Sequence, residues 1–281
     1  MESEPVNPMP PVDPRQQVQQ PADPFHIELL ELAAKMARDA GSLIAEALQR
    51  TRTLETKSSG TDLVTEMDRA AEQLIVSMID AERSDDGILG EEGTSRPGTN
   101  GVRWLIDPID GTTNYVYRHP LFSVSVGVQV HGVTVAGAVS APMLGDLYTA
   151  VLGGGAFRNG QPIHVSGQSQ LSHSLIGTGF AYLAEIRAIQ GQRLAYMLPR
   201  IREIRRGGSA AIDLCFVADG RLDAYFEDGL QPWDECAGLL IAAEAGAVHA
   251  RLQLHREVLL ASSPAIALSL EQLIVDAPVS S

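Results

Sequence analysis

The sequence predicts an α/β fold in which sheets and helices form the layers of a sandwich. Three observations predict it: apolar residues recur at helical spacing near the N-terminus, strand patterns follow one another in the middle, and both patterns interleave in the C-terminal half. This order of elements is typical of layered proteins rather than of a bundle or a barrel. The 281 residues, 44% hydrophobic and 20% charged, have an ordinary globular composition.

The N-terminal region divides into a tail and two helices. Residues 1–22 are rich in Pro and Gln and hold almost no large apolar side chain, so we expect a disordered tail. Asp23 suits an N-cap and Pro24 a first helical position, and apolar spacing then predicts a helix to about residue 51. A second helix is expected from Thr65, with Asp68 completing a variant capping box.

The remaining chain reads as strands followed by alternating strands and helices. Strands are expected at 87–90, 102–106, 121–130, 132–140 and 146–153, and the glycine-rich segment 153–163 predicts a hairpin rather than a nucleotide-binding loop. Further strands are expected near 174–178, 200–205, 222–227 and 257–261, with helices at 183–198, 209–219, from 233, and 264–274. We expect residues 23–281 to form one unit with two sub-lobes that meet near residues 170–180.

Charge and composition narrow the class of partner. A net charge of −14 argues against a nucleic-acid backbone as the main partner. No apolar run reaches the ~18 residues of a membrane span, and the N-terminus lacks a basic-then-apolar signal pattern. Cys215 and Cys236 lie among apolar neighbours, so we expect two reduced core thiols in a cytoplasmic protein.

Carboxylates stand at the ends of apolar elements in four separate segments. These are TDLVTEMD (61–68), LGEEG (89–93), LIDPIDGTTN (105–114) and QPWDECAGLL (231–240). Each has a purely structural explanation, since the aspartates can cap helices or face a helix dipole and the glutamates can lie in a solvated turn. The fourfold recurrence of one pattern favours a shared site instead.

A hard divalent cation would explain the collection of acids. Mg²⁺ takes about six oxygen ligands and favours carboxylates, whereas the histidines form no ligand-spaced pair and the cysteines have no partners for a softer metal. Pro108 stiffens the turn so that Asp107, Asp110 and the carbonyl of Ile109 could face one point. The acids outnumber the needs of one ion, which suggests two or more metals.

Gly111 and Thr112 follow these acids and suit a phosphate. A glycine that opens a helix lets backbone N–H groups approach an oxyanion, and the threonine hydroxyl could orient a water. Other designs fit less well, because an aspartyl-phosphate enzyme needs Asp-x-Asp, a cysteine phosphatase needs Cys-x5-Arg, and an EF-hand needs acids at alternate positions.

Three segments resemble the signatures of the inositol monophosphatase family: GEEG (90–93), WLIDPIDGTTNYVY (104–117) and WDECAGLLIAAEAG (233–246). KSSGTDLVTEMD (57–68) resembles the segment that precedes them, and the likeness extends from about residue 26 to the last helix. The resemblance implies an α-β-α-β-α sandwich, usually a homodimer. It also implies a lithium-sensitive, Mg²⁺-dependent phosphomonoesterase with two or three ions per subunit.

The resemblance assigns metal ligands by motif. Glu91, Asp107 and the Ile109 carbonyl would hold the first ion. Asp107, Asp110 and Asp234 would hold the second, and Glu91 would also help a weaker third.

The resemblance assigns the attacking water as well. Thr112, hydrogen-bonded to Asp68, would position it together with Glu91, while Asp62 and Glu92 match flanking acids. Water would attack phosphorus directly, with no covalent enzyme intermediate, and the second ion would stabilise the departing alkoxide.

Substrate contacts follow from the same likeness. Gly111 and Thr112 would donate to the phosphate, and Ala210 and Glu227 stand where the family contacts the sugar-alcohol hydroxyls. The substrate-binding residues it implies are Asp110, Gly111, Thr112, Gly208, Ala210, Glu227 and Asp234.

The substrate and a second role stay open at this point. Glu227 and the complete DPIDGTTN segment favour myo-inositol 1-phosphate over histidinol phosphate, fructose 1,6-bisphosphate, NADP or 3'-phosphoadenosine 5'-phosphate. Some bacterial family members bind the transcription machinery and assist ribosomal RNA maturation. The basic cluster IREIRRGG (201–208) could contact nucleic acid or RNA polymerase, or could simply end a strand near a dimer interface.

Two departures from the family pattern are visible. Tyr115 replaces the more usual Phe, a change we expect to be silent. Residues 247–257 lack the family's Gly-Asp-rich loop, so we expect a trimmed edge at the substrate rim.

Overall fold

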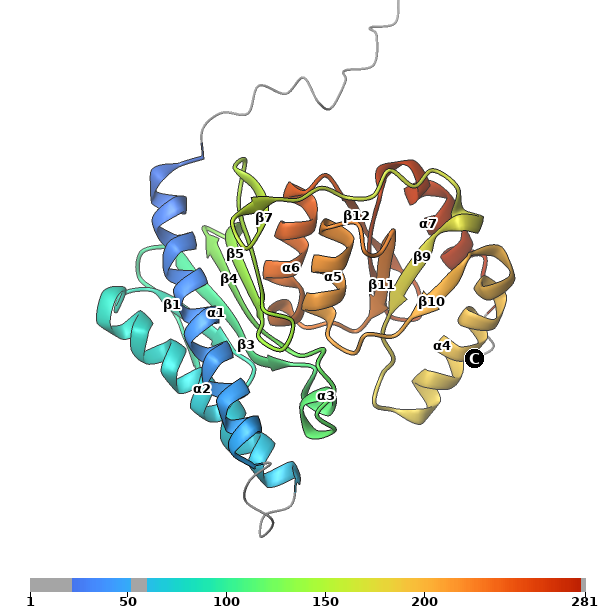
Figure 1. The fold of residues 1–281 in the computed structure, drawn as a ribbon. Helices are drawn as coiled ribbons and strands as arrows, with labels where there is room; N and C mark the ends of the chain where they lie inside the picture. Colours follow the sequence, from blue (N-terminus) through green and yellow to red (C-terminus); the bar gives the residue numbers. More distant parts are fainter. Residues whose placement is uncertain (1–21, 52–59, 279–281) are drawn as a thin grey trace, which may run out of the picture.

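The chain folds into five layers in the order helix, sheet, helix, sheet, helix (Figure 1). The structure, a computed structural model, describes residues 22–51 and 60–278. Its layers confirm the α/β sandwich that the sequence predicts. The expected tail, apart from residue 22, lies outside the described residues.

Two long helices, α1 (Pro24–Thr51) and α2 (Gly60–Glu82), cover the outer face of the first sheet (Figure 1). The backbone N–H of Phe25 donates to the Asp23 carboxylate at 2.9 Å, which confirms the predicted N-cap of α1. Helix α2 begins before Thr65, because residues 61–65 contain no glycine or proline that would end it. The side chains of residues 60–65, including Asp62, lie outside the described part of the structure.

The first sheet has eight strands in the order β2-β1-β3-β4-β5-β6-β7-β8. Strands β1 and β3 are parallel and the other neighbours are antiparallel. The sequence did not predict β2, and the expected hairpin is β7–β8. Their bounds are β1 (Gly87–Gly90), β2 (Ser95–Arg96), β3 (Val102–Asp110), β4 (Ser123–Val130), β5 (Val133–Ala141), β6 (Asp146–Val151), β7 (Gly155–Arg158) and β8 (Gln161–Pro162).

The second sheet has five strands in the order β10-β9-β11-β13-β12. Strand β10 is shorter than expected because residues 198–200 form a 3₁₀ turn. Strand β12 was not predicted; it fills the edge that we expected to be trimmed, and only Leu252 of it is fully buried. The bounds are β9 (Leu175–Thr178), β10 (Glu203–Arg205), β11 (Ala224–Asp228), β12 (Val248–Gln253) and β13 (Glu257–Ser262).

Helices α5 (Ala210–Ala218) and α6 (Pro232–Glu244) form the central layer between the two sheets (Figure 1). Both are strongly apolar, as elements covered on two sides must be. Cys215 and Cys236 lie here as buried free thiols, in agreement with the sequence. Helices α4 (Ala184–Met197) and α7 (Ala267–Val275) cover the far side of the second sheet.

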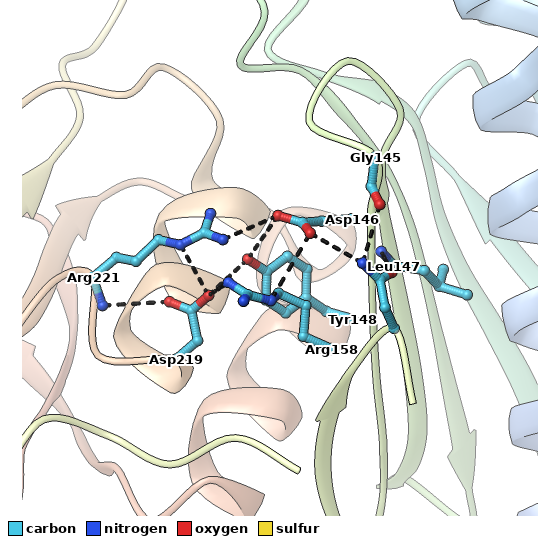
Figure 2. A network of polar contacts seen from close by, with 8 residues as sticks. Gly145, Asp146, Leu147, Tyr148, Arg158, Asp219 and Arg221 are labelled. Carbon is cyan, nitrogen blue, oxygen red and sulfur yellow. Dashed lines mark hydrogen bonds and ion pairs between the residues drawn. The ribbon is translucent and has the colours of Figure 1, made fainter. Parts of the chain in front are cut away.

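A network of polar contacts fixes the C-terminal end of α5 to the first sheet (Figure 2). The Asp219 carboxylate accepts from the Tyr148 hydroxyl at 2.9 Å and pairs with Arg158 at 2.9 Å and with Arg221 at 3.1 Å. A carboxylate is unfavourable at a helix C-terminus, and the two arginines offset that cost. The network therefore holds α5 along a fixed axis.

The short helix α3 (Thr112–Val116) follows β3 and is tied to α1. The buried Tyr115 hydroxyl donates to the Ile44 carbonyl at 3.0 Å, and its ring meets Phe122 edge-to-face. Phenylalanine could not form this hydrogen bond, so Tyr115 adds a contact between α3 and α1, and the expectation of a silent difference stays a prediction. None of the described helices has the length and apolarity needed to cross a membrane.

Candidate active site

A cleft of about 400 Å³ opens where elements of both sheets and of the central layer meet. All predicted site residues except Asp68 line it: Glu91, Asp107, Ile109, Asp110, Gly111, Thr112, Gly208, Ala210, Glu227 and Asp234. Asp68 is buried on α2 behind the cleft. Segments more than a hundred residues apart in the sequence therefore share one cavity.

The end of β3 delivers the two central aspartates. Pairing with β4 is regular up to Asp107 and shifts before Asp110, since Pro108 has no N–H to donate to a neighbouring strand. This irregularity lets both aspartates contribute to the cleft. Gly111 then turns the chain into α3 with φ +91°, a left-handed conformation that suits glycine.

Thr112 does not make the contact that the family resemblance implies. Its hydroxyl donates to the Ile109 carbonyl at 3.2 Å, and the buried Oδ1 of Asp68 has no hydrogen-bond partner among the described residues. A hydroxyl has one proton to donate, so the expected bond to ionised Asp68 is absent while Thr112 bonds to Ile109.

Glu72 of α2, which the sequence reading missed, fixes the turn that carries Glu91. Its buried carboxylate accepts the backbone N–H groups of Glu92 at 2.9 Å and Thr94 at 3.1 Å. Two charge-assisted bonds to one turn hold that turn firmly. Glu91 is thereby presented at the mouth of the cleft, while Glu92 faces Arg69 at 3.9 Å.

Asp110 joins β3 to the N-terminus of α5. Its carboxylate accepts from the Ser209 hydroxyl and from the backbone N–H groups of Ala210 at 3.2 Å and Ala211 at 2.7 Å. Ser209 also caps α5 by accepting from Ile212 at 3.2 Å. A helix N-terminus stabilises an anion, so α5 holds this aspartate in a fixed position.

Glu227 and Asp234 close the opposite wall of the cleft. The Glu227 carboxylate, at the end of β11, accepts from the buried Tyr225 hydroxyl. Asp234 lies in the first turn of α6 and accepts from the Gln231 N–H at 2.7 Å in a capping box. The structural reading of Asp234 as a helix-cap residue therefore holds alongside its place in the cleft.

The acids repel one another and are poorly solvated. Burial, together with the charges of Glu92, Glu91 and Glu72, raises the pKa of Asp68 to about 8. Burial raises the pKa of Asp234 to about 7, against the lowering effect of the Gln231 N–H.

Burial also raises the pKa of other acids that line the cleft. Burial raises the pKa of Asp110 to about 6 even though Ser209 and the α5 amides lower it. Burial raises the pKa of Glu227 to about 7. Burial and the charges of Asp110 and Glu91 raise the pKa of Asp107 well above its usual range.

Comparison with known proteins decides the family. The model of the inositol monophosphatase family matches residues 27–278. The chain belongs to the inositol monophosphatase family. The inositol-1-monophosphatase SuhB of Mycobacterium tuberculosis is 48% identical to it over 204 residues, 69% of this chain and 70% of that protein.

Further relatives agree in fold and differ in name. The Nus factor SuhB of Escherichia coli is 40% identical over 223 residues, covering 78% of this chain and 84% of its own. The solved structure of Mycobacterium tuberculosis SuhB matches with a TM-score of 0.79 and 39% identity, covering 90% of this chain and 98% of that one.

The donor set of this family member suits a hard cation. Every candidate ligand offers oxygen, and the buried Oδ1 of Asp107 has no hydrogen-bond partner among the described residues. Within that same part of the chain, no three Asp, Glu, His or Cys groups form a ready-made metal cluster. The Asp110 carboxylate accepts hydrogen bonds from Ser209 and from the α5 amides.

The basic cluster does not form one surface. Arg205 pairs with Glu203 at 2.9 Å, whereas Arg206 lines the cleft. Sequence reasoning missed Arg206, Arg256 and Ser209 as site residues. Of these only Ser209 carried a local signal, since a serine before an apolar helical run is a typical N-cap.

Proposed function

We propose that this chain hydrolyses small phosphate monoesters, with myo-inositol 1-phosphate as the first candidate. The observation that carries the proposal is the group of carboxylates with raised pKa values along one cleft of about 400 Å³. Neighbouring carboxylates without a cationic partner repel each other, and a bound divalent cation would remove that repulsion. A relative whose structure was solved with inositol monophosphate bound, 29% identical with a TM-score of 0.73, supports the substrate class.

The cation we propose is Mg²⁺, held by Glu91, Asp107, the Ile109 carbonyl, Asp110 and Asp234. When bound, Mg²⁺ supplies charge neutralisation for the phosphate and activation of a water. The protein side chains then position the reactants. Two or three ions per subunit would use these four carboxylates, whereas Glu227 and Asp228 also line the cleft without being proposed as ligands.

The residues around the acids have separate roles in this proposal. Backbone groups of Gly111 and Thr112 bind the phosphate, and Glu91 with Thr112 orients the attacking water. Asp68 acts as a positioning residue, because it becomes the acceptor for Thr112 once that hydroxyl rotates away from Ile109. Glu227, Gly208 and Ala210 contact the alcohol part of the substrate.

The test is a phosphate-release panel on the purified chain. Five substrates are compared in Mg²⁺ and in EDTA: myo-inositol 1-phosphate, histidinol phosphate, fructose 1,6-bisphosphate, NADP and 3'-phosphoadenosine 5'-phosphate. We expect release that requires Mg²⁺, is inhibited by lithium, and is fastest with the inositol ester. No release from any of the five with Mg²⁺ would contradict the proposal.

A second role is a scaffold in transcription, as the name of the Escherichia coli relative suggests. The exposed Arg202 and Arg205 are the part of the basic cluster that remains outside the cleft. Recovery of RNA polymerase subunits with the tagged chain, and their loss in an Arg202→Glu, Arg205→Glu variant, would support it. A homodimer and a cytoplasmic location stay predictions, and light scattering tests the first.

A further inference from the structure

Two arginines line the acid-rich cleft without an acidic partner. Arg206 and Arg256 form no hydrogen bond or ion pair with any residue in the described part of the chain. Their neighbours behave differently, because Arg205 pairs with Glu203 and Arg251 pairs with both Glu235 and Glu257. Both arginines therefore present unneutralised positive charge beside the carboxylates of the cleft, in a chain with a net charge of −14.

Both arginines lie at one edge of the second sheet. Arg206 directly follows β10, and Arg256 directly precedes β13. Strands β10, β9 and β11 are parallel and β13 is antiparallel to β11, so the end of β10 and the start of β13 share an edge. The topology therefore places both side chains at the cleft.

Each guanidinium group packs against a glycine. Arg206 lies against Gly208 and Arg256 against Gly229, in the space that a Cβ atom would fill. Both glycines are left-handed, with φ +93° and +87°, a backbone conformation that disfavours other residues there. The missing Cβ atoms therefore leave room for the two guanidinium groups beside the cleft.

Arg256 also lines two adjoining pockets. The cleft continues into an adjoining pocket of about 330 Å³, and Glu227, Gly229, Leu230 and Arg256 line both. Arg251 lies in the second pocket but is neutralised by its two glutamates. A ligand larger than a simple monoester would extend past Arg256 into this space.

We propose that Arg206 and Arg256 form a subsite for a second anionic group on the substrate. This inference rests on the proposed phosphatase function and extends its substrate class to phosphate esters that carry a second anion. One phosphate lies at the carboxylate end of the cleft and is hydrolysed, and a phosphate or carboxylate elsewhere on the molecule binds the arginines. Guanidinium groups bind either anion through paired N–H donors.

A competing explanation is that these arginines only balance the charge of the acids. Arg206 does act in this way at longer range, since its charge opposes the rise in the pKa of Glu227 and of Asp213. Charge balance would act equally on all substrates. An anion subsite would act only on substrates that carry the second anion, so substrate pairs separate the two.

The experiment compares matched substrates in Arg206→Gln, Arg256→Gln and the double variant. Fructose 1,6-bisphosphate is paired with fructose 1-phosphate, and 3-phosphoglycerate with glycerol 3-phosphate, so that the two pairs distinguish a phosphate from a carboxylate. The wild type should prefer the doubly anionic member of at least one pair. The variants should lose about tenfold or more in kcat/KM for that member, mainly through KM, and change less than about twofold for its partner.

Arg205→Gln is the matched control, because Arg205 is exposed, pairs with Glu203 and does not line the cleft. It should leave both members of each pair unchanged. Equal losses for both members in the cleft variants, no loss, or a wild-type preference for the singly anionic members would overturn the subsite.

A binding measurement keeps this test separate from the proposed activity. The thermal unfolding midpoint is recorded with and without fructose 1,6-bisphosphate in Mg²⁺ for each variant. If no substrate releases phosphate, the proposed function fails. In that case, the subsite is supported if fructose 1,6-bisphosphate raises the unfolding midpoint of the wild type but not of the double variant. It is overturned if the midpoint of the wild type does not rise, or if the double variant shows the same rise. Midpoints without ligand identify a variant that is merely unstable.

Discussion

Replacing Asp234 by Asn should stabilise the metal-free protein while abolishing its activity. Asparagine has the same shape and keeps an oxygen that can accept the Gln231 N–H, so the capping box survives. What disappears is a negative charge beside Asp110 and Glu235. The same charge is the one we propose as a ligand for Mg²⁺.

The magnitude follows from the pKa of Asp234, which burial raises from 3.8 to about 7. Each tenfold change in proton affinity corresponds to about 1.4 kcal/mol, so ionisation at pH 8 costs the metal-free fold about 4 kcal/mol at most. The α6 dipole favours the anion by about 0.3–1 kcal/mol, and partial solvent access reduces the cost further. We expect a net gain of about 1–3 kcal/mol, or roughly 3–8 °C in the unfolding midpoint.

The pH dependence has a definite sign. Because the folded pKa of Asp234 lies above its unfolded value, the stability that it contributes is complete below pH ~4 and is lost as pH rises through about 7. The difference between wild type and Asp234→Asn should therefore be small near pH 4 and largest at pH 8.

The assay is thermal unfolding in EDTA and in Mg²⁺ at several pH values, together with phosphate release. Mg²⁺ should stabilise the wild type at pH 8 and stabilise Asp234→Asn less, because the ligands proposed for the first ion remain in the variant. The variant should release no phosphate. Asp85→Asn is the control, because Asp85 is exposed on a turn and does not line the cleft. The reasoning is refuted if Asp234→Asn is no more stable than wild type at pH 8 in EDTA, or if it turns over normally.

Three further substitutions test the site and the contacts that support it. Ser209→Ala removes the cap of α5, so we expect the free energy of unfolding in denaturant to fall by about 1–2 kcal/mol. It also removes a hydrogen bond that lowers the pKa of Asp110, so the acid limb of the pH–rate profile should move to higher pH. Asp219→Ala breaks the network of Figure 2 and should cost about 2–4 kcal/mol without changing the kcat of the folded enzyme at 25 °C. Glu72→Gln removes one of the two bonds to the Glu91 turn, because an amide NH2 cannot accept from a backbone N–H, and should raise the Mg²⁺ concentration needed for half-maximal rate several-fold.

Each of these has an outcome that would contradict it. An unchanged acid limb in Ser209→Ala would remove that serine from the control of Asp110. A fall in kcat for Asp219→Ala would show that the far end of α5 matters for chemistry as well as stability. An unaltered Mg²⁺ dependence in Glu72→Gln would mean that the Glu91 turn is held by other contacts.

Local patterns in the sequence determined the elements and the chemical type of the site. Period-two and helical spacing located most strands and helices, and the Asp-Pro-Ile-Asp-Gly-Thr run identified an oxygen-rich turn after β3. These features depend on neighbours a few residues apart. They failed where a short edge strand such as β12 exists only because β13 offers it a partner.

The tertiary structure alone decided how distant residues meet. Asp110 is held by Ser209 and the α5 amides about a hundred residues later. Arg206 and Arg256 reach the cleft because β10 ends and β13 begins at the same sheet edge. No local periodicity encodes such contacts, since they depend on the packing of whole layers against one another. For that reason the sequence could indicate a metal-dependent phosphatase. The packing of Arg206 and Arg256 against glycines, and the bond from the Thr112 hydroxyl to Ile109, became visible only in the folded chain.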